Sequence, residues 1–82
     1  MSAIAVRLPH LGASPVRVSV WFADPSDLVY EGDRLVEVLV GGATFDVSAP
    51  ATGRLVAKLA LPGDVVAPEQ VLGTLAADES GE

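Results

Sequence analysis

Hydrophobic residues alternate with polar residues in short runs along the chain, and Pro and Gly separate these runs. An alternation of period two is typical of β-strands that bury one face. The residues that it places on inward faces are Val16, Val18, Val20 and Phe22, then Phe45, Val47 and Ala49, and then Leu55, Ala57 and Leu59, with Lys58 on the opposite face. No run of ten residues free of Pro and Gly shows the spacing of an amphipathic helix. The pattern therefore predicts an all-β domain.

Gly41 and Gly42 join two of the apolar runs. Residues 35–40 are apolar except for Glu37, and an alternating run resumes at Ala43. A two-residue hairpin turn requires positive φ at its central positions, which glycine adopts without steric cost. We therefore expect an exposed hairpin tip at Gly41 and Gly42.

The chain also contains an internal repeat. Residues 25–29 (PSDLV) align with residues 62–66 (PGDVV) at an offset of 37 positions, and residues 6–12 align with residues 47–53 at an offset of 41. Each half is too short to bury an apolar face by itself. The repeat therefore predicts two halves related by a pseudo-two-fold axis.

Length and charge narrow the possible classes of protein. The chain has 82 residues, a net charge of −6 and no cysteine. We predict one domain over residues 4–76, an N-terminal tail over residues 1–3 and a disordered acidic tail over residues 77–82. The acidic charge argues against a nucleic acid partner and favours a soluble monomer. No apolar run is long enough to span a membrane, and the first residues lack the features of a signal peptide, so we expect none. The lack of cysteine fits the cytoplasm.

No group of residues predicts catalysis or a metal site. With one histidine, one lysine and no cysteine, neither a His-based nucleophile pair nor a metal cluster is expected. His10 is interpreted as a surface residue rather than a phosphoryl acceptor, because no second histidine could assist it. Asp27 and Asp64 occupy equivalent turns and are interpreted as turn formers rather than as a catalytic pair. Trp21 alternates away from its apolar neighbours and could be half exposed, although packing across the sheet is favoured.

The order and spacing of these motifs resemble the lipoyl/biotinyl carrier domain over about residues 4–76. The matching segments, each with the family motif that it resembles, are residues 8–12 (LPHLG; lPxLG), 21–27 (WFADPSD; WLVKxGD), 27–38 (DLVYEGDRLVEV; DxVxxGDxLxEV), 43–55 (ATFDVSAPATGRL; ATxEVxAPxxGxL) and 63–72 (GDVVAPEQVL; GDxVxxGxxLxxI). In the second segment, Ser26 replaces a glycine. The resemblance implies a flattened β-barrel, or barrel-sandwich hybrid, of two four-stranded sheets with pseudo-two-fold symmetry.

The chain departs from this family at the residue that carries the cofactor. In the family, a lysine at the hairpin tip (ETDKA) holds lipoate or biotin through an amide. Here Gly41 and Gly42 occupy the aspartate and lysine positions, with Ala43 following them. The only lysine, Lys58, lies in a predicted strand, where no protruding turn surrounds it. We therefore expect no cofactor, although lipoate is the family cofactor. The tip is interpreted as an ordinary turn, with a lost attachment site and a docking loop as alternatives.

These observations lead to a hypothesis of function. The chain is expected to be a non-lipoylated structural or docking module related to the swinging-arm carriers of 2-oxo acid dehydrogenases, and not an enzyme. Its expected partners are proteins, such as components of a dehydrogenase complex. The alternative is an unmodified barrel-sandwich module of the membrane-fusion type found in efflux adaptors. That alternative ranks lower, because those modules lie between two halves of a long helical hairpin, and this sequence shows no helical flank.

Overall fold

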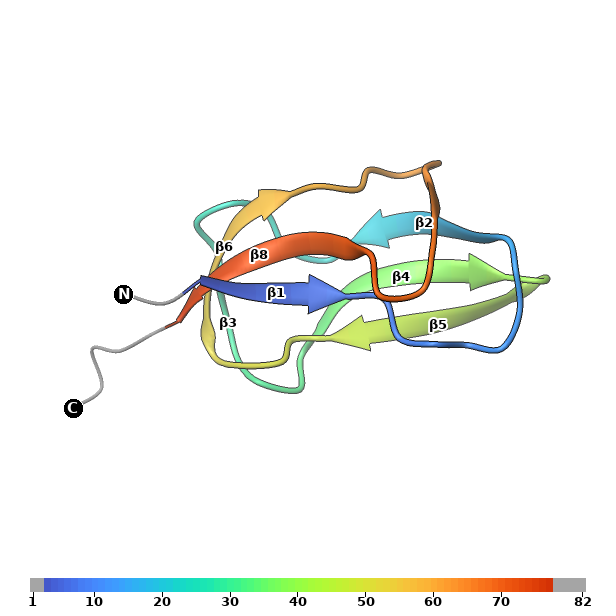
Figure 1. Cartoon of the computed structure of the whole chain (residues 1–82). Coiled ribbons are helices and arrows are strands. Elements are labelled where there is room, and N and C mark those ends of the chain that lie inside the picture. The colour runs from blue at the N-terminus through green and yellow to red at the C-terminus, as the bar shows by residue number, and fades with distance from the viewer. Residues whose placement is uncertain (1–2, 78–82) are drawn as a thin grey trace.

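A computed structural model describes residues 3–77, which form eight β-strands and no helix. The strands are β1 (Ala3–Arg7), β2 (Val16–Trp21), β3 (Leu28–Val29), β4 (Arg34–Val40), β5 (Ala43–Ser48), β6 (Gly53–Lys58), β7 (Val65–Val66) and β8 (Val71–Ala77). They make two four-stranded antiparallel sheets, in the orders β1-β8-β6-β3 and β5-β4-β2-β7 (Figure 1). The predicted all-β class is confirmed. Of the predicted tails, residues 1–2 and 78–82 lie outside the described residues.

Exchanging the two halves of the chain converts one sheet into the other. When β1–β4 are replaced by β5–β8 and the reverse, the order β1-β8-β6-β3 becomes β5-β4-β2-β7. The register follows the same rule. Val18 faces Val38 between β2 and β4, and the residues 37 positions later, Leu55 and Leu75, face each other between β6 and β8. The topology and the register therefore carry the two-fold relation that the internal repeat predicts.

The two sheets bury one continuous core of mainly aliphatic side chains. Its members are Val6, Leu8, Val16, Val18, Trp21, Ala23, Val29, Leu35, Val36, Val38, Val47, Ala49, Leu55, Ala60, Val66, Leu72 and Leu75. Among the described residues, no polar or charged side chain is fully buried. Burial of apolar area, at about 25 cal/mol per Å², is therefore the main stabilising contribution to this fold.

A β-bulge in β2 reverses part of the predicted inward face. Pairing with β4 shifts between Val18 and Val20, so that Ser19 is the extra residue. An extra residue moves every later side chain of the strand to the other face. Trp21 therefore faces the core with 9% of its surface exposed, whereas Val20 and Phe22 are exposed. The prediction that Val20 and Phe22 point inward is wrong for this reason, and the packing of Trp21 across the sheet is confirmed.

The symmetry-related bulge in β6 has the same effect. Pairing with β8 shifts between Leu55 and Ala57, so that Val56 is the extra residue and Ala57 turns away from the face that holds Leu55. Lys58 thereby reaches the face that holds Leu55 and lies opposite Gly73. Leu59 is exposed instead of buried. The prediction that placed Leu59 inward and Lys58 on the opposite face is therefore wrong.

Phe45 shows that a core-facing position can still be exposed. Phe45 pairs directly with the buried Val38, so the two side chains point to the same side of the sheet. However, Phe45 belongs to the outer strand β5 near the hairpin tip, and 42% of its surface is exposed. Val47 and Ala49, further along, are buried as predicted. The predicted burial of Phe45 is wrong because β5 is an edge strand, with no neighbouring strand on its outer side.

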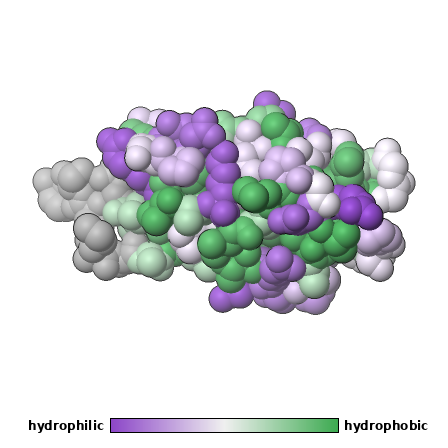
Figure 2. Space-filling model, turned by 90° about the horizontal axis from the view of Figure 1, so that it is seen from above, coloured by the Kyte–Doolittle hydropathy of each residue, from purple (hydrophilic) through white to green (hydrophobic). Residues whose placement is uncertain are grey.

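Several large apolar side chains lie on the surface. They are Val20, Phe22, Leu28, Tyr30, Leu39, Phe45, Val56, Leu59, Leu61 and Val65. Figure 2 shows hydrophobic side chains in separate groups between hydrophilic ones over the face seen from above. Single exposed apolar side chains are normal in a small domain. Exposure alone therefore does not identify a binding site here.

Four turns share one hydrogen-bonding geometry, two in the first half of the chain and two in the second. They span residues 24–27, 30–33, 61–64 and 67–70. In each, the backbone N–H of the first residue donates to a side-chain oxygen of the fourth, and the N–H of the fourth donates to the carbonyl of the first. The third residues, all with positive φ, are Ser26, Gly32, Gly63 and Glu69. The predicted role of Asp27 and Asp64 as turn formers is confirmed.

Substitutions at the symmetry-related residues Ser26 and Gly63 should have opposite effects on stability. Their φ values are 82° and 94°, a region that costs a residue with a Cβ about 1 kcal/mol. No heavy atom lies within 4 Å of a Cβ built on Gly63, so only this strain opposes a side chain. Gly63→Ala should lower the free energy of unfolding by about 1 kcal/mol. Ser26→Gly should raise it by about 0.5 kcal/mol, since the added freedom of the unfolded chain offsets part of the relief. Urea unfolding followed by circular dichroism measures both changes, and shifts of the same sign would contradict this account.

Candidate functional site

The β4–β5 hairpin ends in a two-residue turn at Gly41 and Gly42, as the Gly-Gly pair predicts. Their φ values are 55° and 85°, and the last strand pair before the turn is Val40 with Ala43. No heavy atom lies within 4 Å of a Cβ built on either glycine. Figure 1 shows this tip at the end of the molecule opposite to the start of β1. A paired hairpin therefore presents an exposed turn that has no side chain of its own.

The residues around the tip are uncharged. The segment from Val38 to Phe45 reads VLVGGATF and contains neither an amine nor a titratable group. Leu39 and Phe45 expose apolar surface on either side of the turn. The tip can therefore offer shape and apolar contact, but no nucleophile and no proton donor or acceptor with an accessible pKa.

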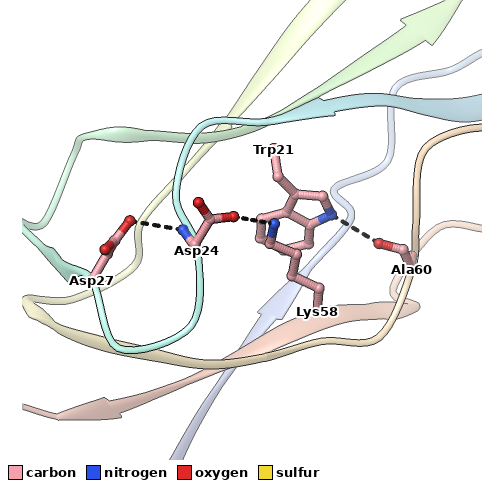
Figure 3. A network of polar contacts seen from close by, with 5 residues as sticks. All are labelled: Trp21, Asp24, Asp27, Lys58 and Ala60. Atoms are coloured by element: carbon pink, nitrogen blue, oxygen red, sulfur yellow. Dashed lines mark hydrogen bonds and ion pairs between the residues drawn. The ribbon is translucent and has the colours of Figure 1, made fainter.

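The only lysine of the chain is held against the body of the domain. Lys58 ends β6, and its Nζ donates to Oδ1 of Asp24 at 2.7 Å. The same ammonium lies 5.9 Å from the centre of the Trp21 ring (Figure 3). Only 22% of the lysine side chain is exposed. This amine therefore differs in setting from an amine on a protruding turn.

The Trp21 side chain is held in place by a hydrogen bond and by close packing. Its Nε1 donates to the carbonyl oxygen of Ala60 at 2.8 Å (Figure 3). Opposite the ring, Gly73 leaves the space that the indole occupies, because a Cβ there would lie 2.8 Å from its Cη2 atom. The arrangement of Trp21, Lys58 and Asp24 thus joins the two sheets and is structural.

The remaining candidates from the sequence do not come together in one site. His10 is on the surface, as predicted, and its Nε2 lies 3.2 Å from Oε2 of Glu69. Asp27 and Asp64 each use one carboxylate oxygen within their own turn. Among residues 3–77, no group of three His, Cys, Asp or Glu side chains could hold a metal ion. In the same part of the chain there is no helix that could cross a membrane.

One surface feature was not found from the sequence. Phe22, Asp33 and Arg34 line a hollow beside β3, and none of them was a candidate functional residue in the sequence. The available signal was their departure from the internal repeat, where Leu59, Gln70 and Val71 stand at the equivalent positions.

No protein-family model matches this chain, but a curated relative and a solved structure resemble it. The lipoamide acyltransferase component of the branched-chain alpha-keto acid dehydrogenase complex of Pseudomonas putida is 25% identical over 83 residues. That match covers 99% of this chain and 20% of the relative, so the chain spans about a fifth of the relative's length. The solution structure of the lipoyl domain of the 2-oxoglutarate dehydrogenase complex from Azotobacter vinelandii superposes with a TM-score of 0.69 at 21% identity. The superposition covers 88% of this chain and 96% of the lipoyl domain.

The fold of this chain is that of a lipoyl domain, a flattened barrel-sandwich of two four-stranded sheets. The resemblance to the lipoyl domain family, inferred from the motifs, is confirmed by both comparisons.

Proposed function

We propose that this chain is a lipoyl-domain-like module that carries no lipoyl group and serves as a docking or structural domain. The observation that supports this function is the Gly41–Gly42 turn, which stands where the family motif has aspartate and lysine. Lipoate attachment forms an amide between the lipoate carboxyl group and a primary amine. A glycine at this position offers no side chain for that bond.

The setting of Lys58 also supports a domain without cargo. A ligase that modifies a carrier domain must reach an amine that projects from the surface. Here the amine is bound by the Asp24 carboxylate and lies over the Trp21 ring. Modification would require this ion pair to break and the side chain to leave the ring.

The proposed partners are protein components of a 2-oxo acid dehydrogenase complex. Both similar proteins belong to complexes of this kind, and the net charge of −6 suits contact with basic protein surfaces. In this proposal the chain is a cytoplasmic monomer with no catalytic activity of its own, and its carrier-like fold contributes shape and recognition.

Intact mass spectrometry tests the proposal directly. After incubation with lipoate ligase, lipoate and ATP, the mass of the protein should be unchanged, because no exposed tip presents an amine. A lipoyl domain with the family lysine, treated in parallel, should gain one lipoyl group. A gain of one lipoyl group on the unaltered chain, mapped to Lys58 or to the N-terminus, would refute the proposal.

The double substitution Gly41→Asp and Gly42→Lys provides a matched variant. It rebuilds the family tip on a hairpin that already has an exposed two-residue turn. Positive φ at both positions costs the new side chains about 1 kcal/mol each, which the paired strands are expected to tolerate. Modification of this variant but not of the parent would locate the missing chemistry at the tip.

A further inference from the structure

A hollow of about 390 Å³ lies beside β3. Figure 1 shows β3 at the end of the molecule opposite to the hairpin tip. Its lining includes the apolar residues Phe22, Leu28 and Val29 and the charged residues Asp27, Asp33 and Arg34. Phe22 and Leu28 expose 40% and 37% of their surfaces, whereas Val29 is buried. The hollow therefore combines accessible apolar surface with charged groups of both signs.

The equivalent place in the second half of the chain has a different chemistry. Asp27, Leu28 and Val29 correspond to the similar residues Asp64, Val65 and Val66. In contrast, Phe22, Asp33 and Arg34 correspond to Leu59, Gln70 and Val71. Since the backbone hydrogen bonds of the two halves are equivalent, the fold requires neither the aromatic ring nor the two charges.

The negative charge of Asp33 is not needed for its turn. Oδ2 of Asp33 accepts a hydrogen bond from the backbone N–H of Tyr30 at 3.0 Å. In the symmetry-related turn, Oε1 of Gln70 accepts from the N–H of Ala67 at 2.9 Å. A neutral amide thus fulfils the same structural role. The turn therefore does not require the negative charge of Asp33, which is available to contact a cation.

Arg34, the cation in the lining of the hollow, already has partners. The Arg34 guanidinium lies 4.4 Å from the centre of the Phe22 ring and 3.6 Å from Oδ2 of Asp46. Lys58 is bound to Asp24. Both positive charges are therefore directed to groups of the domain itself.

The carboxylates of the hollow, in contrast, have no cation partner. Within residues 3–77, neither Asp27 nor Asp33 forms an ion pair. Each uses Oδ2 to accept a backbone N–H, so Oδ1 can accept another donor. Arg54, which lies opposite Leu28 in the sheet, donates to the carbonyl oxygen of Ser26 instead. The hollow therefore offers two carboxylates without an ion pair next to apolar surface, an arrangement that suits a cation with an apolar neighbour.

We propose that this hollow binds a basic amphipathic segment of a partner protein, with an arginine next to an apolar side chain. The guanidinium donates to the free oxygens of Asp27 and Asp33, and the apolar side chain packs on Phe22 and Leu28. Arginine suits the site better than lysine, because its planar guanidinium presents several donors in a geometry that matches carboxylate oxygens. The site is separate from the Gly41–Gly42 tip, so it does not depend on whether the domain is lipoylated.

Nuclear magnetic resonance titration of the full chain tests this docking site. The probe is N-acetyl-Leu-Arg-amide, and N-acetyl-Leu-Gln-amide is its neutral match. The arginine peptide should cause saturable shifts of backbone amides in residues 22–34 and bind about five-fold more tightly than the glutamine peptide. The equivalent residues 59–71 should remain unshifted. Equal binding of the two peptides, or equal shifts in both halves, would overturn the proposal.

Asp33→Gln is the matched variant, since the chain itself uses glutamine at the equivalent turn. It should weaken binding of the arginine peptide about five-fold while leaving the thermal midpoint unchanged. Asp64→Asn, which removes a charge from the symmetry-related position, should leave the affinity unaltered. An affinity that stays the same in Asp33→Gln, or falls equally in Asp64→Asn, would refute the assignment of this site.

Discussion

Trp21→Ala is expected to lower the free energy of unfolding by about 3–5 kcal/mol. The indole is buried in the core, donates to the Ala60 carbonyl and fills the space above Gly73. Its removal leaves a cavity, an unpaired carbonyl oxygen and a lysine that has lost the ring beneath it. In a domain of this size, such a loss is a large share of the total stability.

Urea unfolding followed by far-ultraviolet circular dichroism measures this effect without relying on the fluorescence of the removed residue. Trp21→Phe keeps an aromatic ring but loses the N–H donor, and we expect it to cost about 1–2 kcal/mol. A midpoint unchanged by Trp21→Ala would mean that the bulge in β2 does not turn this residue inward.

Leu35→Ala should be nearly as damaging, with a loss of about 2–5 kcal/mol. Leu35 and its symmetry equivalent Leu72 are both fully buried, so Leu72→Ala should give a similar loss. Val47→Ala removes fewer atoms and should cost less. Leu39→Ala, at an exposed position of the same strand as Leu35, is the control and should change stability by about 0.5 kcal/mol or less.

The comparison of Leu35 with Leu72 also tests the two-fold relation. The carbonyl oxygen of Leu35 accepts a hydrogen bond from the backbone N–H of Phe22. The carbonyl oxygen of Leu72 accepts the equivalent bond from the N–H of Leu59. If only one of the two substitutions is destabilising, the energetic equivalence of the two halves is contradicted, although their topology agrees.

Two surfaces of this domain, the Gly41–Gly42 tip and the hollow beside β3, differ in the chemical groups that they expose. The hairpin tip is an exposed turn of two glycines and has no amine side chain. The hollow beside β3 is lined by the charged residues Asp33 and Arg34, whereas the symmetry-related positions hold the uncharged residues Gln70 and Val71. Since they lie in different parts of the molecule, the mass measurement and the peptide titration can succeed or fail independently.

The sequence alone determined the fold class, the hairpin and the two-fold relation. Gly-Gly between apolar runs allows a turn with positive φ at both positions, and turns are local structures that neighbouring residues decide. The repeat of residues 25–29 at residues 62–66 predicted that the halves are equivalent. The lack of any side chain at Gly41 and Gly42 was also visible in the sequence, because it depends on residue type and not on conformation.

Only the tertiary structure decided which faces of β2 and β6 are buried. An alternating pattern assumes an uninterrupted strand, whereas the bulges at Ser19 and Val56 arise from pairing with strands distant in the sequence. Each bulge reverses the later side chains, and this brings Trp21 and Lys58 together on the inner side. The exposure of Phe45 likewise depended on the position of β5 at the edge of its sheet. The hollow beside β3 formed from residues of separate segments, which no local pattern could place together.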